Sequence, residues 1–467
     1  MWQGGFSRGL VFLLLGVALV VAACADGEAG ETTNPTDDNG TVAPDDSEAG
    51  DDEPGTDDGG QTTTGSAGTG CDIPPGEPFI TTESVELTDL GEVDGVRVSA
   101  AMYPHPDYEE ELWSQWGQGM VVEDGRFFSA IGDHLAADGN SYVYEYDPST
   151  NTLTMVGDVL SFVDHEPGTW GYGKIHSQMV PGPCGEIYFS TYWGSYRDIT
   201  FEGNYTGDIL FRLDPFGRTL TPLSVPVEFH GQASLAADPG TGQIFGEAID
   251  PIAKNDDVDI GPFFAYDVID EEVSYVGPDE PHVGFRSMLV DAEGRVYYSI
   301  GGGQLETYDP ETGETSTHDA VLPGEFLRAV TAPGPDGSVY GVTEEPDTFF
   351  VMNSDGSIDE LGAALGYTAS VALSPDGSRF YYMPGAHGNA PQWGSPLISV
   401  DTETGEQTVV VELNEVIQEE FGYTVGGTYN IAISPDGKTV YTGVNGGESG
   451  SEEQSFGEVF LLVIELP

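Results

Sequence analysis

The sequence predicts an all-β fold, a seven-bladed β-propeller with four-stranded antiparallel blades, and three observations predict it. A glycine turn recurs seven times, a different aspartate turn lies between its copies, and turn residues are abundant, with 65 Gly and 31 Pro. Each repeat unit spans only 40 to 60 residues, so it cannot bury a core alone. Closing such units into a ring protects the edges of their sheets, which favours a propeller.

The first 23 residues are predicted to be a signal peptide. Arg8 precedes an apolar run from Leu10 to Val21, which is too short to span a bilayer comfortably. The segment VAAC, ending at Cys24, resembles the bacterial lipobox, in which the cysteine is lipidated and becomes the mature N-terminus. We therefore expect export through the inner membrane and a lipid anchor at Cys24 that holds the protein on the cell membrane, facing outward. The alternative is an ordinary secretory signal cleaved nearby.

Residues 24–70 form the predicted tether between this anchor and the folded domain. They contain no Lys or Arg, and Asp, Glu, Thr, Gly and Pro dominate. Such a segment buries too little apolar surface to offset its ordering entropy, so we expect it to be disordered and extended. The propeller then occupies residues 71–467. Cys71 and Cys184 either form a disulfide, as the oxidising compartment would favour, or remain two unpaired thiols.

The charge of the chain excludes one class of partner. There are 13 Lys and Arg against 80 Asp and Glu, which gives a formal net charge of −67. A protein this acidic does not neutralise phosphates, so we expect no nucleic-acid partner. The hydrophobic fraction of 38% still predicts a real core, and we expect a monomer.

The glycine turn connects the inner strand of each unit to the next strand. In the segments SPDG at 374–377 and 434–437, Pro presets φ at the first turn position and Gly takes the position that needs a positive φ. Alternating apolar residues lead into and out of both turns, as in a hairpin. Related turns are centred on Gly125, Gly185, Gly242, Gly294, Gly337, Gly377 and Gly437.

The aspartate turn supplies the second hairpin of each unit, and therefore four strands per blade. After Gly437, however, the seventh unit has three strands and no second turn. We expect residues 84–91 to supply its fourth strand, pairing antiparallel with Val459–Ile464 while Val85 and Leu87 pack inward. The aspartate turns are at Asp147, Asp214, Asp267, Asp309, Asp355 and Asp401.

Candidate site residues occur where the inner strands begin. Alignment on the strand before each glycine turn places His176, Arg286, Arg328 and Tyr429 at equivalent positions, at one end of the ring axis. Lys174 lies on the same face of its strand as His176. His230 lies at about the same level in the third unit.

These residue types are suited to an anionic ligand. Cationic side chains in a strongly acidic protein create a local positive region that favours a carboxylate or a sulfate. The alternative is that they pair with acidic residues lining the channel. His134 begins a loop beyond a strand, and Tyr192, Trp193 and Arg197 place aromatic and basic groups together, as sugar-binding surfaces often do.

Motifs for metal or cofactor chemistry are missing from the sequence. It has no GxSxG, no HExxH, no paired-cysteine zinc motif and no glycine-rich phosphate loop. We therefore predict no cofactor and no metal site. Calcium at the aspartate-rich turns is the one cation that these residues suit, although Asp is also the preferred first residue of such turns.

The repeats resemble those of the YVTN, NHL and SMP-30/gluconolactonase-like bacterial propellers across roughly residues 110 to 467. Three segments are also similar to propeller-type polysaccharide lyases acting on uronate polymers: GDH…YEYD, which contains His134, KIHSQMV…IYFSTYWG, and PGAHG…GGTYNIAISPDG, which contains His387. That resemblance implies His and Tyr as base and acid, with Arg neutralising the uronate carboxylate. The available counterparts are His176 or His134, Tyr192 and Arg286. A lactonase would need an acidic metal cluster at the axis, which we do not find.

Two functions follow as hypotheses. The first is a lipid-anchored, extracytoplasmic propeller that binds an anionic or carbohydrate ligand at its axial face. If it is an enzyme, β-elimination on a uronate is the favoured reaction. The second is a noncatalytic platform for protein partners at the cell surface. Side chains converging within hydrogen-bond reach at one ring face would favour the first, and a channel closed by salt bridges would favour the second.

Overall fold

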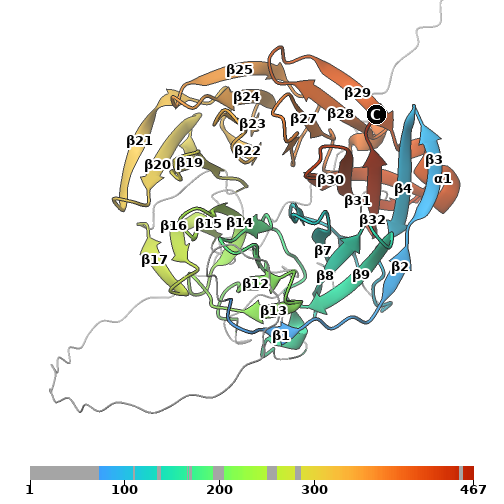
Figure 1. The fold of residues 1–467 in the computed structure, drawn as a ribbon, viewed down its shortest axis with the longest axis horizontal. Helices are drawn as coiled ribbons and strands as arrows, with labels where there is room; N and C mark the ends of the chain where they lie inside the picture. Colours follow the sequence, from blue (N-terminus) through green and yellow to red (C-terminus); the bar gives the residue numbers. More distant parts are fainter. Residues whose placement is uncertain are drawn as a thin grey trace, which may run out of the picture. The chain divides into compact units, whose positions relative to one another are not determined.

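Seven antiparallel sheets surround a common axis and form a ring (Figure 1). The seven-bladed β-propeller predicted from the repeats is therefore confirmed. The computed structural model describes residues 73–108, 111–133, 138–165, 167, 171–192, 205–249, 260–278, 286–451 and 456–467. Among these residues, no helix is both long and apolar enough to cross a membrane.

The first three blades follow one another along the chain, each running from the axis outwards. Blade 1 consists of β6 (Met120–Val121), β7 (Phe127–Asp133), β8 (Ser141–Asp147) and β9 (Thr152–Asp158), with β5 (Trp113–Ser114) also paired to β7. Blade 2 consists of β10 (Val180–Pro181), β11 (Ile187–Ser190), β12 (Leu210–Asp214) and β13 (Thr219–Pro222). Blade 3 consists of β14 (Gly231–Asp238), β15 (Gln243–Ile249), β16 (Ile260–Asp267) and β17 (Glu272–Val276).

The next three blades repeat this order. Blade 4 consists of β18 (Leu289–Val290), β19 (Val296–Gly301), β20 (Gln304–Asp309) and β21 (Glu314–Val321). Blade 5 consists of β22 (Phe326–Val330), β23 (Val339–Glu344), β24 (Thr348–Met352) and β25 (Ile358–Ala363). Blade 6 consists of β26 (Ala372–Leu373), β27 (Arg379–Tyr382), β28 (Pro396–Asp401) and β29 (Gln407–Glu412).

Both predicted turns lie where the sequence places them. The glycine turn joins the innermost strand of each blade to the next one, and Gly377 and Gly437 have φ values of 73° and 72°. The aspartate turns join the outer two strands, and their carboxylates accept hydrogen bonds from turn amides. For example, Asp214 Oδ1 accepts from the N–H of Gly217 at 2.7 Å. Asp at these turns therefore has a structural role.

Blade 7 is built from both ends of the domain. The chain supplies β30 (Tyr423–Ile433), β31 (Thr439–Glu448) and β32 (Glu458–Glu465) after the short helix α1 (Asn414–Phe421). The fourth strand is β4 (Val96–Met102), which pairs antiparallel with β32, and β3 (Thr88–Val93) lies outside it. The N-terminal part of the domain thus closes the ring, as expected.

The predicted identity of the closing strand was wrong. Residues 84–86 form β2, which pairs with β9 of blade 1, so that Val85 faces Leu153 and not β32. Leu87 does pack inward and is 5% exposed. Alternation does not distinguish the two segments, because β4 alternates as well. In β4, Val96, Val98 and Ala100 are buried, whereas Arg97 is exposed and Ser99 is half-buried.

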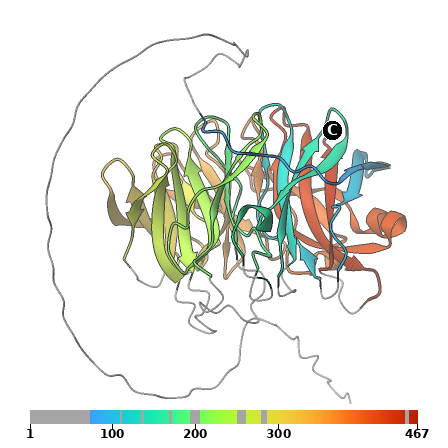
Figure 2. The ribbon, with the colours of Figure 1, turned by 90° about the horizontal axis from the view of Figure 1, so that it is seen from below.

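Residues 77–102, which we call the N-terminal strap, run along the outer edges of three blades. Beginning at β1 (Glu77–Pro78), the strap pairs with β13 of blade 2, then with β9 of blade 1, and finally with β32 of blade 7. Figure 2 shows its blue segment crossing the outer side of the blades. The strap covers strand edges that would otherwise offer unpaired backbone groups to other chains.

One of the two cysteines of the predicted disulfide lies among the described residues. Cys184, in the glycine turn of blade 2, is disulfide-bonded. Its predicted partner Cys71 lies outside the described residues, as does Cys24, so the pairing of Cys71 and the lipid anchor stay predictions.

Two truncations should separate closing the ring from covering its edges. Deleting residues 73–87 removes β1 and β2, whereas deleting residues 73–102 also removes the six residue pairs between β4 and β32. The longer deletion should cost several kcal/mol more, since each lost hydrogen bond is worth about 0.5–1.5 kcal/mol. Melting temperature and protease cleavage of blade 7 measure the difference. Equal melting temperatures for the two truncations would contradict closure by β4.

Candidate functional site

Side chains at the starts of the inner strands, joined by Tyr192 after β11 and His387 between β27 and β28, meet at one end of the ring axis. They come from every blade except blade 3, and ring contacts and hydrogen bonds connect them. We call this group the axial cluster: Trp116, Lys174, His176, Tyr192, Arg286, Arg328, Tyr367, His387 and Tyr429.

The spacing of the repeats explains this convergence. Trp116, His176 and Arg328 each lie nine residues before the turn glycine of their blade. Because the blades are copies of one hairpin pattern arranged about an axis, equal spacing brings these positions to equal height. In blade 3 the residue nine positions before Gly242 is Ala233. It contributes its backbone oxygen to the cluster.

His176 holds the guanidinium of Arg286 in place. His176 is 6% exposed, its Nδ1 lies 2.8 Å from Ala233 O, and its Nε2 lies 2.5 Å from Arg286 Nη1. A guanidinium can only donate, so Nε2 accepts from it and Nδ1 carries the hydrogen donated to Ala233. Burial, together with the charge of Arg286, lowers the pKa of His176 well below its ordinary value. A neutral His176 therefore serves here as a positioning residue.

Arg328 is a buried cation enclosed by aromatic rings. It is 3% exposed, its Nε donates to the Tyr367 hydroxyl at 2.5 Å, and its guanidinium lies 5.0 Å from the Tyr367 ring centre and 5.8 Å from that of Tyr429. Glu344 Oε2 approaches Nε at 3.9 Å. This is the acidic partner expected if the cations were purely structural, but it lies at the outer limit of an ion pair. A buried cation with so distant a carboxylate favours a further anion.

Tyr429 and His387 form a hydrogen-bonded pair. The Tyr429 hydroxyl lies 2.6 Å from His387 Nδ1, and burial raises the pKa of Tyr429, which is 2% exposed. Partial loss of water and the charges of Arg286, Arg328 and Lys174 lower the pKa of His387 to about 4. Because His387 is exposed, we expect the cations to cause most of this shift. A neutral His387 accepts the proton that Tyr429 donates.

Lys174 and the aromatic rings complete the cluster. Lys174 Nζ lies 4.3 Å from the centre of the Trp116 ring and 5.9 Å from that of Tyr192. The backbones of Lys174 and Tyr192 pair with each other, which fixes their relative position. The Trp116 ring lies 6.0 Å from that of His176 and 5.1 Å from that of Tyr429. The cations therefore lie against the faces of rings that could also contact a flat ligand.

The other predicted site residues are not all in this cluster. His230 directly precedes β14. Its Nδ1 lies 2.7 Å from Glu228 O, and its ring lies beside Gly261. Neither of these two contacts reaches the cluster. His134, Trp193 and Arg197 lie outside the described residues, and their proposed roles stay predictions.

Trp116, Tyr367 and Glu344 were not predicted as site residues. Trp116 was available from the sequence, because the nine-residue spacing that identifies His176 and Arg328 also identifies Trp116 in blade 1. Tyr367 lies ten residues before the turn glycine of blade 6, not nine. Glu344 is the last residue of β23, which the repeat alignment does not mark. His387 was noted only as one of several loop histidines, since nothing in the sequence connects it to Tyr429.

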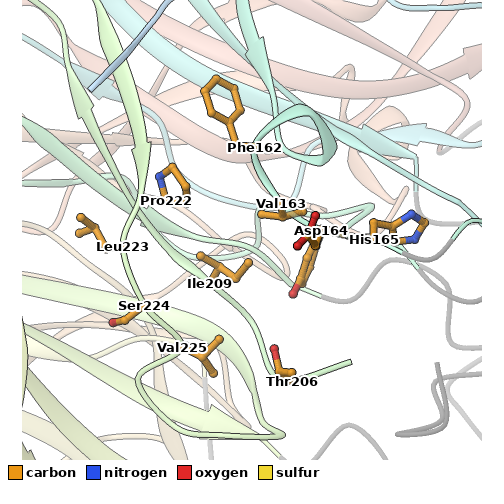
Figure 3. Close-up of a pocket in the computed structure, with 11 residues that line it drawn as sticks. Phe162, Val163, Asp164, His165, Thr206, Ile209, Pro222, Leu223, Ser224 and Val225 are labelled. Carbon is orange, nitrogen blue, oxygen red and sulfur yellow. The ribbon is translucent and has the colours of Figure 1, made fainter. Parts of the chain in front are cut away.

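The described residues contain no group of three or more His, Cys, Asp or Glu placed to hold a metal ion. Calcium at the aspartate turns stays a prediction. Two cavities lie elsewhere in the described structure. One of 810 Å³ runs along the axis from Gln118, Gln178 and Ser287, just beyond the axial cluster, to the glycine turns. One of 660 Å³ lies between blades 1 and 2 (Figure 3).

Comparison with known proteins identifies propellers of unrelated sequence. No family model matches the chain, and no curated protein matches its sequence. Among solved structures, a streptogramin B lyase is 12% identical, covering 80% of this chain and 100% of its own, with a TM-score of 0.49. A catalytically inactive virginiamycin B lyase from Staphylococcus aureus with quinupristin is 9% identical, covering 79% and 99% (TM-score 0.49). The RRP9 WD40 repeats are 8% identical, covering 79% and 97% (TM-score 0.49).

The electrostatic coupling within the axial cluster can be tested by titrating His387. Its ring should stay neutral well below pH 6.5, and Arg286→Met should raise its pKa, because a neighbouring positive charge is removed. NMR of the histidine ring protons against pH measures both. Arg379→Met, at the glycine-turn end of blade 6, is the matched control and should change nothing. An unchanged His387 titration in Arg286→Met would contradict the coupling.

Proposed function

We propose that the axial cluster binds the carboxylate of an anionic carbohydrate, and that the protein acts on uronate polymers by β-elimination. The observation that carries the proposal is the gathering of Lys174, Arg286 and Arg328 at one point of a chain with a net charge of −67. Concentrating scarce cations against the charge of the whole protein favours a site for an anion.

The aromatic rings support a carbohydrate over a small inorganic anion. Trp116 and Tyr192 already lie against Lys174, and Tyr367 against Arg328, at 4.3 to 5.9 Å. Such rings can pack on the apolar face of a sugar while the guanidinium groups take its carboxylate in a two-pronged hydrogen bond.

The Tyr429–His387 pair supports proton transfer next to that carboxylate. In the proposed reaction the Tyr429 oxygen takes the proton from the carbon bearing the carboxylate, as the hydroxyl proton passes to His387 Nδ1. The electron pair of the broken C–H bond forms the C4–C5 double bond, the C4–O bond breaks, and the leaving oxygen receives the proton from His387. Arg286 and Arg328 stabilise the charge that develops on the carboxylate.

Two kinds of variant should distinguish the residues needed for substrate binding from the residue needed for turnover. Arg286→Ala and Arg328→Ala should each weaken uronate binding by about 1.5–3 kcal/mol, the value of a hydrogen bond to a charged group. Tyr429→Phe should retain binding and lose turnover. Calorimetry with galacturonate, glucuronate and mannuronate oligomers measures affinity, and ultraviolet absorbance of the new double bond measures elimination.

Exposed Arg379→Ala is the control for the charge change, and melting temperatures establish that each variant is folded. If both arginine variants bound the oligomers as tightly as the wild type, the cations would belong to the structure of the ring. Binding without any elimination would retain the carbohydrate site and reject the lyase.

We further propose that the protein is a lipoprotein on the outer side of the cell membrane. The support is the VAAC segment at Cys24 and the acidic tether that follows it. Cys24→Ser should release the protein into the soluble fraction, because a lipid anchor can no longer form. Membrane fractionation with detection of the propeller measures this. Retention of the variant on membranes would rule out the anchor.

A further inference from the structure

The cavity between blades 1 and 2, which we call the seam cavity, has the size of a ligand site. Its volume is 660 Å³, within the range of about 300–1,000 Å³ that is usual for small-molecule sites. The segment after β9 supplies one side of it, and the starts and ends of the outer strands of blade 2 supply the other (Figure 3).

The walls of the seam cavity are mostly apolar, and its rim is acidic. The apolar residues are Phe162, Val163, Ile209, Leu223 and Val225. Asp164 is exposed at the rim, where Thr206 and His165 also lie. A second carboxylate in this cavity would meet Asp164 and the acidic surface of the protein, and none of the three cations is among the described residues that line the cavity. An uncharged group with an apolar face is therefore the better occupant.

One short segment of the chain connects the seam cavity to the axial cluster. Tyr172 lines the cavity, and Lys174 and His176, two and four residues later on the same segment, belong to the cluster. The Cα atoms of Tyr172 and His176 are at most about 14 Å apart, because four residues of extended chain span no more. Both sites are formed at the ends of the strands opposite the glycine turns. A chain of linked sugar rings could therefore occupy both at once.

We propose that the seam cavity is a second subsite, which holds an uncharged sugar unit linked to the acidic unit in the axial cluster. This inference rests on the proposed function and specifies its substrate as an oligomer or polymer in which acidic and uncharged units are neighbours. Phe162 and Leu223 contact the apolar face of the second unit. Asp164 disfavours a second carboxylate.

A substitution that blocks the mouth of the seam cavity tests the subsite without changing any residue of the axial cluster. Thr206 is exposed, so Thr206→Trp should fold and place a large ring at the mouth of the cavity. Calorimetry with the full chain compares galacturonate with digalacturonate whose second unit is methyl-esterified. Wild type should bind the dimer about tenfold more tightly than the monomer. Thr206→Trp should lose this gain and keep the monomer affinity.

A second variant tests whether Asp164 disfavours a second carboxylate in the seam cavity. Wild type should prefer the methyl-esterified dimer to the free diacid, and Asp164→Arg should reverse this preference. Thr315→Trp, on the exposed outer strand β21 of blade 4, is the matched control for the added ring and should retain the full gain.

The outcomes separate the two proposals. The subsite is overturned if Thr206→Trp still binds the dimer more tightly than the monomer, or if Asp164→Arg still prefers the methyl-esterified dimer to the diacid. In either case, binding of the monomer upholds the axial site. Failure of the wild type to bind galacturonate, glucuronate or mannuronate in any length overturns the proposed function, and the subsite with it.

Discussion

Pairing between β4 and β32 is the interaction on which the rest of the structure depends. A ring of sheets has no internal edge only if its first and last strands are joined, and here six residue pairs join them. Packing between blades then adds stability, because each blade buries its faces against two neighbours. At this joint Val98 and Ala100 of β4 lie in one core cluster with Leu462 and Ile464 of β32. Closure therefore combines backbone pairing with apolar burial.

The axial cluster exists only because the ring is closed. Arg286, Arg328 and Tyr429 lie more than 40 residues apart along the chain, and each is carried by a different blade. A change in the number or tilt of the blades would move them out of contact. Bringing two arginines and a lysine together is electrostatically costly. The aromatic rings, the neutral His176 and the overall charge of −67 make it tolerable.

Much of the fold could be predicted from the sequence, because turn chemistry is local. Gly at positive φ and Asp accepting turn hydrogen bonds mark each hairpin, and they gave the correct number and order of blades. The closing strand could not be predicted in this way. Residues 84–91 and β4 both show the alternation that identifies a strand, and the partner of the closing strand lies at the other end of the domain. Only tertiary contact selects β4 over residues 84–91.

The site was predictable to the extent that it follows the repeat. His176 and Arg328 lie nine residues before the turn glycine of their blades, Arg286 and Tyr429 lie eight before it, and these positions come together in the axial cluster. His387 and Tyr367 come from connections whose lengths differ between blades, so no alignment of repeats marks them. For His230, position in the repeat was a poor guide to the site. A similar height in the repeat did not bring its side chain to the axis, because it lies beside Gly261.

The strap also sets the order in which the domain can be completed during synthesis. Residues 96–102 are made before the inner strands of all seven blades, whereas their partner β32 follows all of these strands along the chain. Until then a strand containing Val98, Ala100 and Ala101 has no sheet to join. Its partner β32 comes from the other end of the domain's sequence. Such high contact order slows folding and prolongs the exposure of unpaired edges. Mutual repulsion between these very acidic chains would keep nascent molecules apart during that delay.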